Sequence, residues 1–245
     1  MENEPNNVSS DDLASRLKNV IHFKNLPLKD RLDIVRSGQI RQIPADTVIF
    51  SEEDPCSGMY ILLRGHVHLC KMGPQGQENI IADLYPVIMF NEVALLDGGP
   101  NPYTAIADQK SLIWKISLDN YQKLLSRYVD EPYMQLSLGL LQIMAGRYRE
   151  LADHYADLSF LTVPVRLARL IYEISGDGRQ SINRQDISIN EMAARISTVP
   201  EAISRALNFL KCQGVITTNR LTISIVDRDE LIKLAQINQD FMKSF

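Results

Sequence analysis

The chain contains 245 residues, of which 45% are hydrophobic and 23% are charged, and its formal net charge is -4. This composition is typical of a globular protein with enough apolar material for a core, without disulfides or metals. No apolar run approaches the ~20 residues that span a bilayer, and the acidic N-terminus is not expected to be a secretory signal. The wide spacing of Cys56, Cys70 and Cys212 argues against a zinc or iron–sulfur site made by cysteine alone.

The segment from Gly38 to Ser117 contains short apolar runs rich in Ile, Val and Tyr, separated by Gly, Pro and Asp. Runs of this kind with regular turn signals predict short antiparallel strands in a sandwich or barrel. Gly73-Pro74-Gln75-Gly76 is a predicted hairpin tip. The predicted strands are centred on residues 48–50, 59–63, 67–69, 80–84 and 113–116.

A long helix is predicted from Pro132 to Leu158, because proline is tolerated in the first turn of a helix and not in its interior. Starting with Met134 and Ser137, residues along one side of this helix recur at alternating intervals of three and four, and nearly all of them are apolar. A narrow seam of this kind over ~25 residues favours a self-associating helix over one packed only on its own domain. The expected dimer seam consists of Leu141, Met144, Tyr148, Leu151, Tyr155 and Leu158.

Two short helices and a hairpin are predicted near the C-terminus. Ser188 and Glu191 form a capping-box pattern in which the serine hydroxyl caps the helix and the glutamate reaches back to the cap. The first helix is expected over residues 189–196 and the second from Pro200 to about Gln213. Two helices joined by three residues are typical of a helix-turn-helix, and the following hairpin (215–223) would be a wing.

The second helix carries side chains suited to reading base pairs in a major groove. Glu201 can accept a hydrogen bond from cytosine and Arg205 can donate two to guanine, whereas Lys211 and Arg220 are expected at phosphates. The alternative is a solvated helix face on which Glu201 and Arg205 merely form an i,i+4 pair. The expected DNA-contacting residues are Ser188, Thr198, Pro200, Glu201, Ser204, Arg205, Asn208, Lys211 and Arg220.

Charge is unevenly distributed along the chain. Residues 1–159 carry 15 Lys and Arg against 21 Asp and Glu, whereas residues 160–245 carry 11 against 9. Between Arg195 and Arg220 there are four cations and one anion. The acidic total therefore does not exclude DNA, because the predicted helix-turn-helix is locally basic.

Several motifs resemble, in the same order, those of the CRP/FNR superfamily of bacterial transcription regulators. Residues 49–67 resemble the start of its cyclic-nucleotide-binding β-roll, and residues 90–100 resemble the phosphate-binding cassette of that roll. Residues 160–168 resemble the start of its DNA-binding domain, and residues 200–214 its recognition helix. The resemblance implies an α+β fold with a sensory, jelly-roll-like antiparallel β-roll (1–130), a dimerisation helix (131–159) and a winged helix-turn-helix (160–245).

The resemblance fails where nucleotide-binding members hold the cyclic phosphate. Those members have Gly-Glu followed, about nine residues later, by Arg-Ser, and the arginine binds the phosphate. Here Asn91 precedes Glu92, and the Arg-Ser position falls on Asn101-Pro102 or Tyr103-Thr104. No arginine lies between residues 64 and 127. Because loss of a charge-assisted bidentate clamp is costly, the sequence argues against cyclic AMP as the effector.

A second departure lies on the long helix. The hydroxyl pair that meets adenine in cyclic AMP binders aligns with Leu151 and Ala152, which offer no such hydrogen bond. A cyclic dinucleotide, a small acid or haem stays open as the effector, whereas the scattered cysteines argue against an iron–sulfur cluster. The candidate effector pocket comprises Asn91, Glu92, Val93, Asn101, Tyr103, Thr104, Tyr148, Leu151 and Ala152.

The expected function is that of a homodimeric, sequence-specific transcription regulator in the bacterial cytoplasm. Its expected partners are double-stranded DNA with a palindromic site and a second copy of the chain, with RNA polymerase as a candidate and no membrane. The alternative is a ligand-binding signalling or scaffold module that does not bind DNA. An enzyme is not expected, because the sequence shows no nucleophile–base pair, P-loop or metal-ligand spacing.

Overall fold

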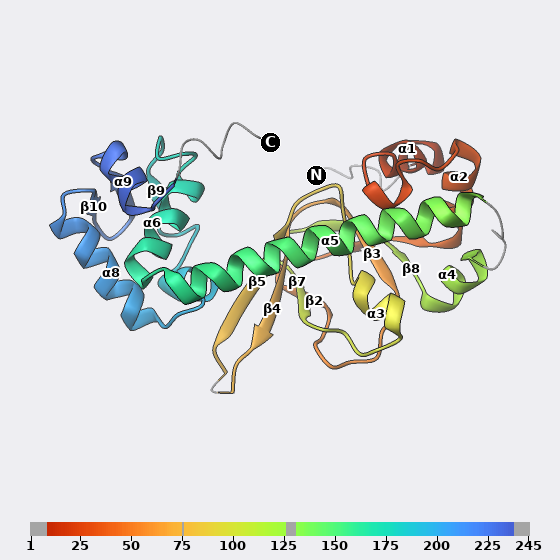
Figure 1. The fold of residues 1–245 in the computed structure, drawn as a ribbon, viewed down its shortest axis with the longest axis horizontal. Coiled ribbons are helices and arrows are strands. Elements are labelled where there is room, and N and C mark those ends of the chain that lie inside the picture. The colour runs from red at the N-terminus through yellow and green to blue at the C-terminus, as the bar shows by residue number, and fades with distance from the viewer. Residues whose placement is uncertain (1–8, 75, 126–130, 238–245) are drawn as a thin grey trace, which may run out of the picture. The chain divides into compact units, whose positions relative to one another are not determined.

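The structure, a computed structural model, describes residues 9–74, 76–125 and 131–237, with the backbone alone for residues 125 and 131–135. The described residues form two compact units, one within residues 1–71 and 81–150 and the other within residues 72–80 and 151–245. Antiparallel sheets precede a long helix and a helical region with a small sheet, so the predicted α+β class is confirmed (Figure 1).

The first unit is built on short strands, as the alternation of apolar runs and turn residues predicted. Its helices are α1 (Ser10–Leu17), the 3-10 helix η1 (Ile21–Phe23), α2 (Leu28–Ser37), α3 (Glu92–Asp97) and α4 (Leu118–Leu125). Its strands are β1 (Gln39–Ile43), β2 (Thr47–Phe50), β3 (Met59–Arg64), β4 (Val67–Met72), β5 (Glu78–Leu84), β6 (Ile88–Phe90), β7 (Thr104–Ala107) and β8 (Ser111–Ile116). The ends of β4 and β5 at their shared turn fall in the second unit.

Two four-stranded sheets form the roll, with the strand orders β1-β8-β3-β6 and β2-β7-β4-β5. Strand β3 is buried over Met59–Leu63, which explains its continuous apolar sequence. Trp114 of β8 is fully buried, and its indole nitrogen donates to the Val35 carbonyl at 3.1 Å. This bond satisfies the polar atom of the largest buried side chain of the unit and joins β8 to α2. At the predicted hairpin tip, Gly76 N donates to the Gly73 carbonyl at 2.9 Å, and residue 75 lies outside the described residues.

The long helix α5 (Glu131–Phe160) matches the predicted Pro132–Leu158 helix. In the first unit, Leu136 and Leu140 pack in its core. Gly139 allows this close packing, because a Cβ added there would lie 2.7 Å from the Cα of His22. The side chain of Met134, which the seam pattern includes, lies outside the described residues.

His22 is a buried histidine beneath α5, and its Nε2 lies 3.2 Å from the Tyr121 hydroxyl. Burial lowers the pKa of His22 to about 4. The unfolded chain therefore binds a proton between about pH 6.5 and 4 that the folded chain excludes. We expect the free energy of unfolding to fall by about 2 kcal/mol from this group between pH 7.5 and 5. Urea unfolding at the two pH values checks this, with His22→Gln as a variant that should lose less; an equal loss in both proteins would contradict it.

The second unit contains a three-stranded sheet and a helical core. After α5 come α6 (Val163–Ile174), β9 (Ile182–Asn183), α7 (Ile189–Arg195), α8 (Pro200–Cys212), β10 (Ile216–Thr218), β11 (Thr222–Ile225) and α9 (Arg228–Leu234). The strand order is β10-β11-β9, so the predicted two-stranded wing gains a third strand. Its core includes Ile171 of α6, Met192 of α7, and Ile203 and Leu210 of α8.

Candidate nucleic-acid interface and candidate effector pocket

The start of α7 is fixed by the predicted serine cap. Ser188 Oγ accepts from the Glu191 amide at 3.0 Å, which confirms the first half of the capping box. The second half is wrong, because Glu191 Oε1 instead pairs with Arg195 Nε at 3.1 Å, one turn further on. The following turn is tight, with Ser197 at φ 53° and the Thr198 amide donating to the Ala193 carbonyl at 2.9 Å.

Helix α8 divides into an apolar and a polar face, as helical spacing predicted. Ile203, Ala206, Leu207 and Leu210 are buried. Glu201, Ser204, Arg205, Asn208 and Lys211 are exposed. Among the described residues, Glu201 and Arg205 do not form the i,i+4 ion pair, and both side chains are exposed to solvent.

The other residues expected at DNA surround this face. Ser188 and Arg220 are exposed, whereas Thr198 and Pro200 are half-buried at the entry to α8. Ser204 Oγ donates to the Pro200 carbonyl at 3.1 Å, so this hydroxyl is already engaged within the helix. Arg220 lies in the turn between β10 and β11.

The effector-pocket prediction falls on a buried polar cluster where β6 meets α3. Asn91 has φ 65°, a conformation that favours glycine and that asparagine tolerates, which explains its place where nucleotide binders have Gly. Its Nδ2 donates to the Gly58 carbonyl and to Asn101 Oδ1, each at 3.0 Å. Asn101 Nδ2 in turn donates to the Ser51 carbonyl at 3.0 Å. Asn101 therefore braces the cluster through hydrogen bonds within the chain.

Arg147 of α5, which the sequence prediction missed, supplies a cation to this cluster. Its Nε donates to the buried Glu92 Oε1 at 3.2 Å, and its Nη2 donates to the Met89 carbonyl at 3.2 Å. It follows Glu92 by 55 residues, so no local motif links the two. The signal that could have found it is helical spacing, because Arg147 lies seven residues after Leu140 and four after Ile143, which pack on the core of the first unit.

Two acceptors in this cluster have no hydrogen-bond partner among the described residues, namely Asn91 Oδ1 and Glu92 Oε2. The Tyr103 hydroxyl accepts from the Asn91 amide at 3.2 Å. Burial, with a further contribution from the charge of Glu92, raises the pKa of Tyr103, so its phenol stays neutral and keeps a proton to donate. Acceptors of this kind suit a ligand that brings donors better than one that brings phosphate oxygens.

The other residues predicted for the effector pocket do not take part in this hydrogen-bonded cluster. Val93 is half-buried, and Thr104 Oγ1 accepts from the Glu52 amide at 3.0 Å. Tyr148, Leu151 and Ala152 are exposed on α5.

His66 bears on the haem alternative. Its Nδ1 lies 2.9 Å from Asp108 Oδ2 and its Nε2 lies 2.9 Å from Asp83 Oδ1. The hydrogen bond to Asp83, joined by that to Asp108, raises the pKa of His66 against the opposing effect of burial. Since both ring nitrogens face carboxylates, His66 would have to give up one of these contacts to ligate iron.

An exposed apolar stripe runs along the surface of α5. Leu141 is 64% exposed, Tyr148 73%, Leu151 62% and Tyr155 72%. Leu158 continues this stripe, and Met144 within it is half-buried. Contiguous apolar exposure of this kind on a helix marks an interaction surface. Within the described ranges, no helix is long and apolar enough to cross a membrane.

The roll, the long helix and the exposed face of α8 beside a wing define a DNA-binding regulator with a sensory domain. Residues 40–128 match the cyclic nucleotide-binding domain, and residues 165–234 match the Crp-like helix-turn-helix domain. The chain belongs to the CRP/FNR family of transcription regulators, which are not enzymes. The predicted family is thereby confirmed.

Two bacterial relatives illustrate the similarity in sequence. The CRP-like cAMP-activated global transcriptional regulator of Mycobacterium tuberculosis is 27% identical over 198 residues, which cover 79% of this chain and 86% of the relative. The Cyclic AMP receptor protein of Thermus thermophilus is 29% identical over 198 residues, covering 80% and 88%.

Two solved structures share the fold. The c-di-GMP responsive global regulator CLP of Xanthomonas campestris has a TM-score of 0.71 at 16% identity and covers 82% of this chain and 100% of its own. A transcriptional regulator of the crp/fnr family from Eubacterium rectale has a TM-score of 0.72 at 18% identity, covering 87% and 97%.

Proposed function

We propose that the protein is a homodimeric, sequence-specific DNA-binding regulator of the bacterial cytoplasm, controlled by a signal other than cyclic AMP. The exposed polar face of α8 carries this proposal, because Glu201 and Arg205 stand free of each other on a helix whose opposite face is buried. Residues 1–130 would sense the signal, residues 131–159 would dimerise, and residues 160–245 would bind DNA. RNA polymerase is a further candidate partner, and no membrane is involved.

Dimerisation is supported by the exposed stripe of α5. Two copies of this seam side by side would bury its leucines and leave the tyrosine hydroxyls at the rim. A two-fold dimer presents two copies of α8, and such dimers bind half-sites about one helical turn, ~34 Å, apart.

An ion pair supports transmission of the signal from α5 to the DNA-binding helices. Arg169 of α6 binds both carboxylate oxygens of Asp157 of α5, at 2.7 and 2.8 Å. Its Nε donates to the Ala235 carbonyl, just beyond α9, at 2.8 Å. A change at the end of α5 would thus act directly on α6 and α9. For an effector to shift the equilibrium, it must bind the DNA-competent arrangement more tightly than the idle one.

Selection of bound duplexes from a random pool tests the DNA-binding function. The proposal predicts enrichment of a palindrome with two half-sites about one turn apart. The rival function, a ligand-binding scaffold that does not bind DNA, predicts no enriched sequence.

Cyclic AMP is not expected to bind at the effector pocket, although both named bacterial relatives carry that nucleotide in their names. Asn101 is one of the two positions, with Tyr103, that align with the phosphate-binding arginine of nucleotide binders, and its amide is already engaged. A ligand at about one hundred times its Kd adds about 2.7 kcal/mol to stability. We expect cyclic AMP at about 1 mM to leave the melting temperature unchanged in scanning fluorimetry. A saturable rise with nucleotide concentration would show that the pocket binds it.

A further inference from the structure

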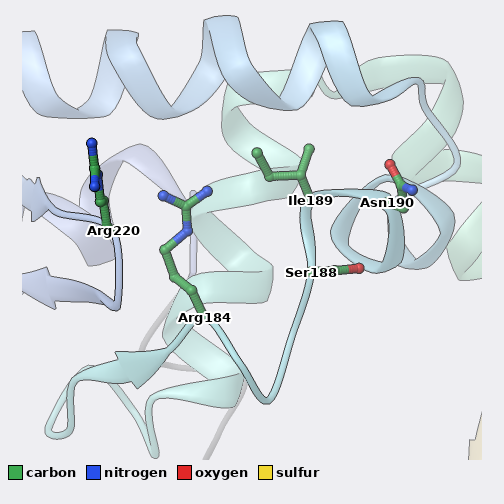
Figure 2. Close-up of a pocket in the computed structure, with 5 residues that line it drawn as sticks. All are labelled: Arg184, Ser188, Ile189, Asn190 and Arg220. Atoms are coloured by element: carbon green, nitrogen blue, oxygen red, sulfur yellow. The ribbon is translucent and has the colours of Figure 1, made fainter.

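A hollow lies beside the wing, and part of its lining has no assigned role. It has a volume of about 450 Å³ and is lined by Arg184, Ser188, Ile189, Asn190 and Arg220 (Figure 2). The sequence pattern placed Ser188 and Arg220 at DNA, but it assigned nothing to Arg184 and Asn190. The hollow therefore extends the candidate DNA-binding surface away from α8 and toward β9.

Hydrogen bonds within the chain fix Arg184 beside the wing. The backbone amide of Arg184 donates to the Leu221 carbonyl at 2.8 Å, and its Nη1 donates to the Asn219 carbonyl at 3.0 Å. Asn219 Oδ1 in turn accepts from the amides of Leu221 and Thr222, at 2.8 and 2.7 Å. Arg220 lies within this braced turn, so the Arg184 side chain and the backbone that carries Arg220 are fixed before any ligand arrives.

The hollow is positively charged. Figure 2 shows the guanidinium groups of Arg184 and Arg220 directed to the same side. In the part of the chain that the structure describes, neither arginine pairs with a carboxylate, and no Asp or Glu lines the hollow. Two acids lie close by along the chain. Asp186, two residues after Arg184, is exposed and does not line the hollow. Glu191 is bound to Arg195. Two neighbouring guanidinium groups without a counter-ion favour an anion between them.

The polar lining is suited to phosphate oxygens. Ser188 Oγ accepts from the Glu191 amide, which leaves its hydroxyl proton free to be donated. The Asn190 side chain is exposed and can donate through its amide. The lining thus offers charged and neutral donors together, as phosphate contacts in DNA complexes commonly do.

We propose that this hollow binds a backbone phosphate of the DNA duplex, with Arg184 and Arg220 donating to its oxygens. This inference rests on the proposed function and adds Arg184 and Asn190 to the DNA-binding surface. The lining arginine Arg220 is exposed, as are Ser188 and Asn190, whereas sites for small molecules enclose most of their ligand. A duplex backbone therefore fits the site better than a free small anion.

Arg184→Gln tests the proposal on the full-length protein. Affinities are measured by fluorescence anisotropy, over a range of salt concentrations, for the selected palindrome and for an unrelated duplex of equal length. We expect both affinities to fall by a similar factor, about five- to tenfold, because a phosphate contact carries no base information. We expect the slope of log K against log salt to become shallower by about two, one contact for each protomer.

Two variants separate this role from a merely structural one. Arg184→Lys keeps the charge and should preserve most of the salt slope, even if the bond to Asn219 is weakened. Arg179→Gln removes an exposed arginine of the same unit that does not line the hollow and should change neither affinity. A loss with Arg184→Gln no larger than that with Arg179→Gln, or one confined to the palindrome, would overturn the phosphate site alone. A wild-type protein that binds neither duplex would overturn the proposed function and the phosphate site with it.

Discussion

Replacement of Leu151 by glutamate is expected to convert the proposed dimer into monomers. Leu151 is 62% exposed in the single chain and lies in the apolar stripe of α5. In a two-fold seam, the substitution would bury two carboxylates near each other, and an uncompensated buried charge is strongly unfavourable. We expect the dimer dissociation constant to rise by about a hundredfold or more, which corresponds to about 2.8 kcal/mol. Sedimentation velocity over a range of protein concentrations measures this change.

The same variant should lose the advantage of binding two half-sites at once. Linked binding raises the apparent affinity by about 10²- to 10⁴-fold, so the affinity for the palindrome should fall while that for one half-site changes little. Gln142→Glu introduces the same side chain at an exposed position of α5 outside the stripe and should leave the dimer intact. Because Leu151 was also placed in the effector pocket, Tyr155→Glu is needed as a second variant of the stripe. If both stripe variants sediment as intact dimers, the seam is not the dimer interface.

The DNA-binding helices could be predicted because their signals are local. The serine cap of α7, the proline that starts α8 and the apolar spacing of α8 all lie within about 25 residues. Each signal fixes an end or a face of one helix and needs no distant partner. The forward pairing of Glu191 with Arg195 was missed because two acceptable partners compete for that carboxylate within one turn.

The inside of the β-roll could be predicted only in outline. The short strands β1, β6 and β7 were not predicted individually, since three to five residues give too little alternation to identify a strand. The contacts of Glu92 with Arg147 and of His66 with Asp108 join residues far apart in the sequence. Such pairs are created by the packing of elements and leave no spacing pattern to read.

Arg147 also refines the argument about the effector. The sequence showed that no arginine follows Glu92 at the spacing of a phosphate clamp, yet the structure brings an arginine from α5 to that glutamate. Because Arg147 already donates to Glu92 and to a backbone carbonyl, it balances a buried carboxylate rather than standing open to an anion. The expectation that cyclic AMP does not bind therefore rests on the hydrogen bonds of the whole cluster and not on one missing side chain.

Replacement of Arg205 by alanine is expected to weaken binding to the preferred site by about 1 to 3 kcal/mol, which is about 5- to 150-fold. Arg205 is exposed on α8, with no carboxylate partner among the described residues, so its guanidinium is available for two hydrogen bonds to guanine. Repeating the duplex selection with the variant should show one base position in each half-site losing its preference, while the other positions keep theirs. Lys211→Ala serves as the matched control on the same face, because a phosphate contact should weaken all duplexes alike. If Arg205→Ala weakens every sequence equally and relaxes no position, Arg205 contacts the backbone, and base reading must come from other residues of α8.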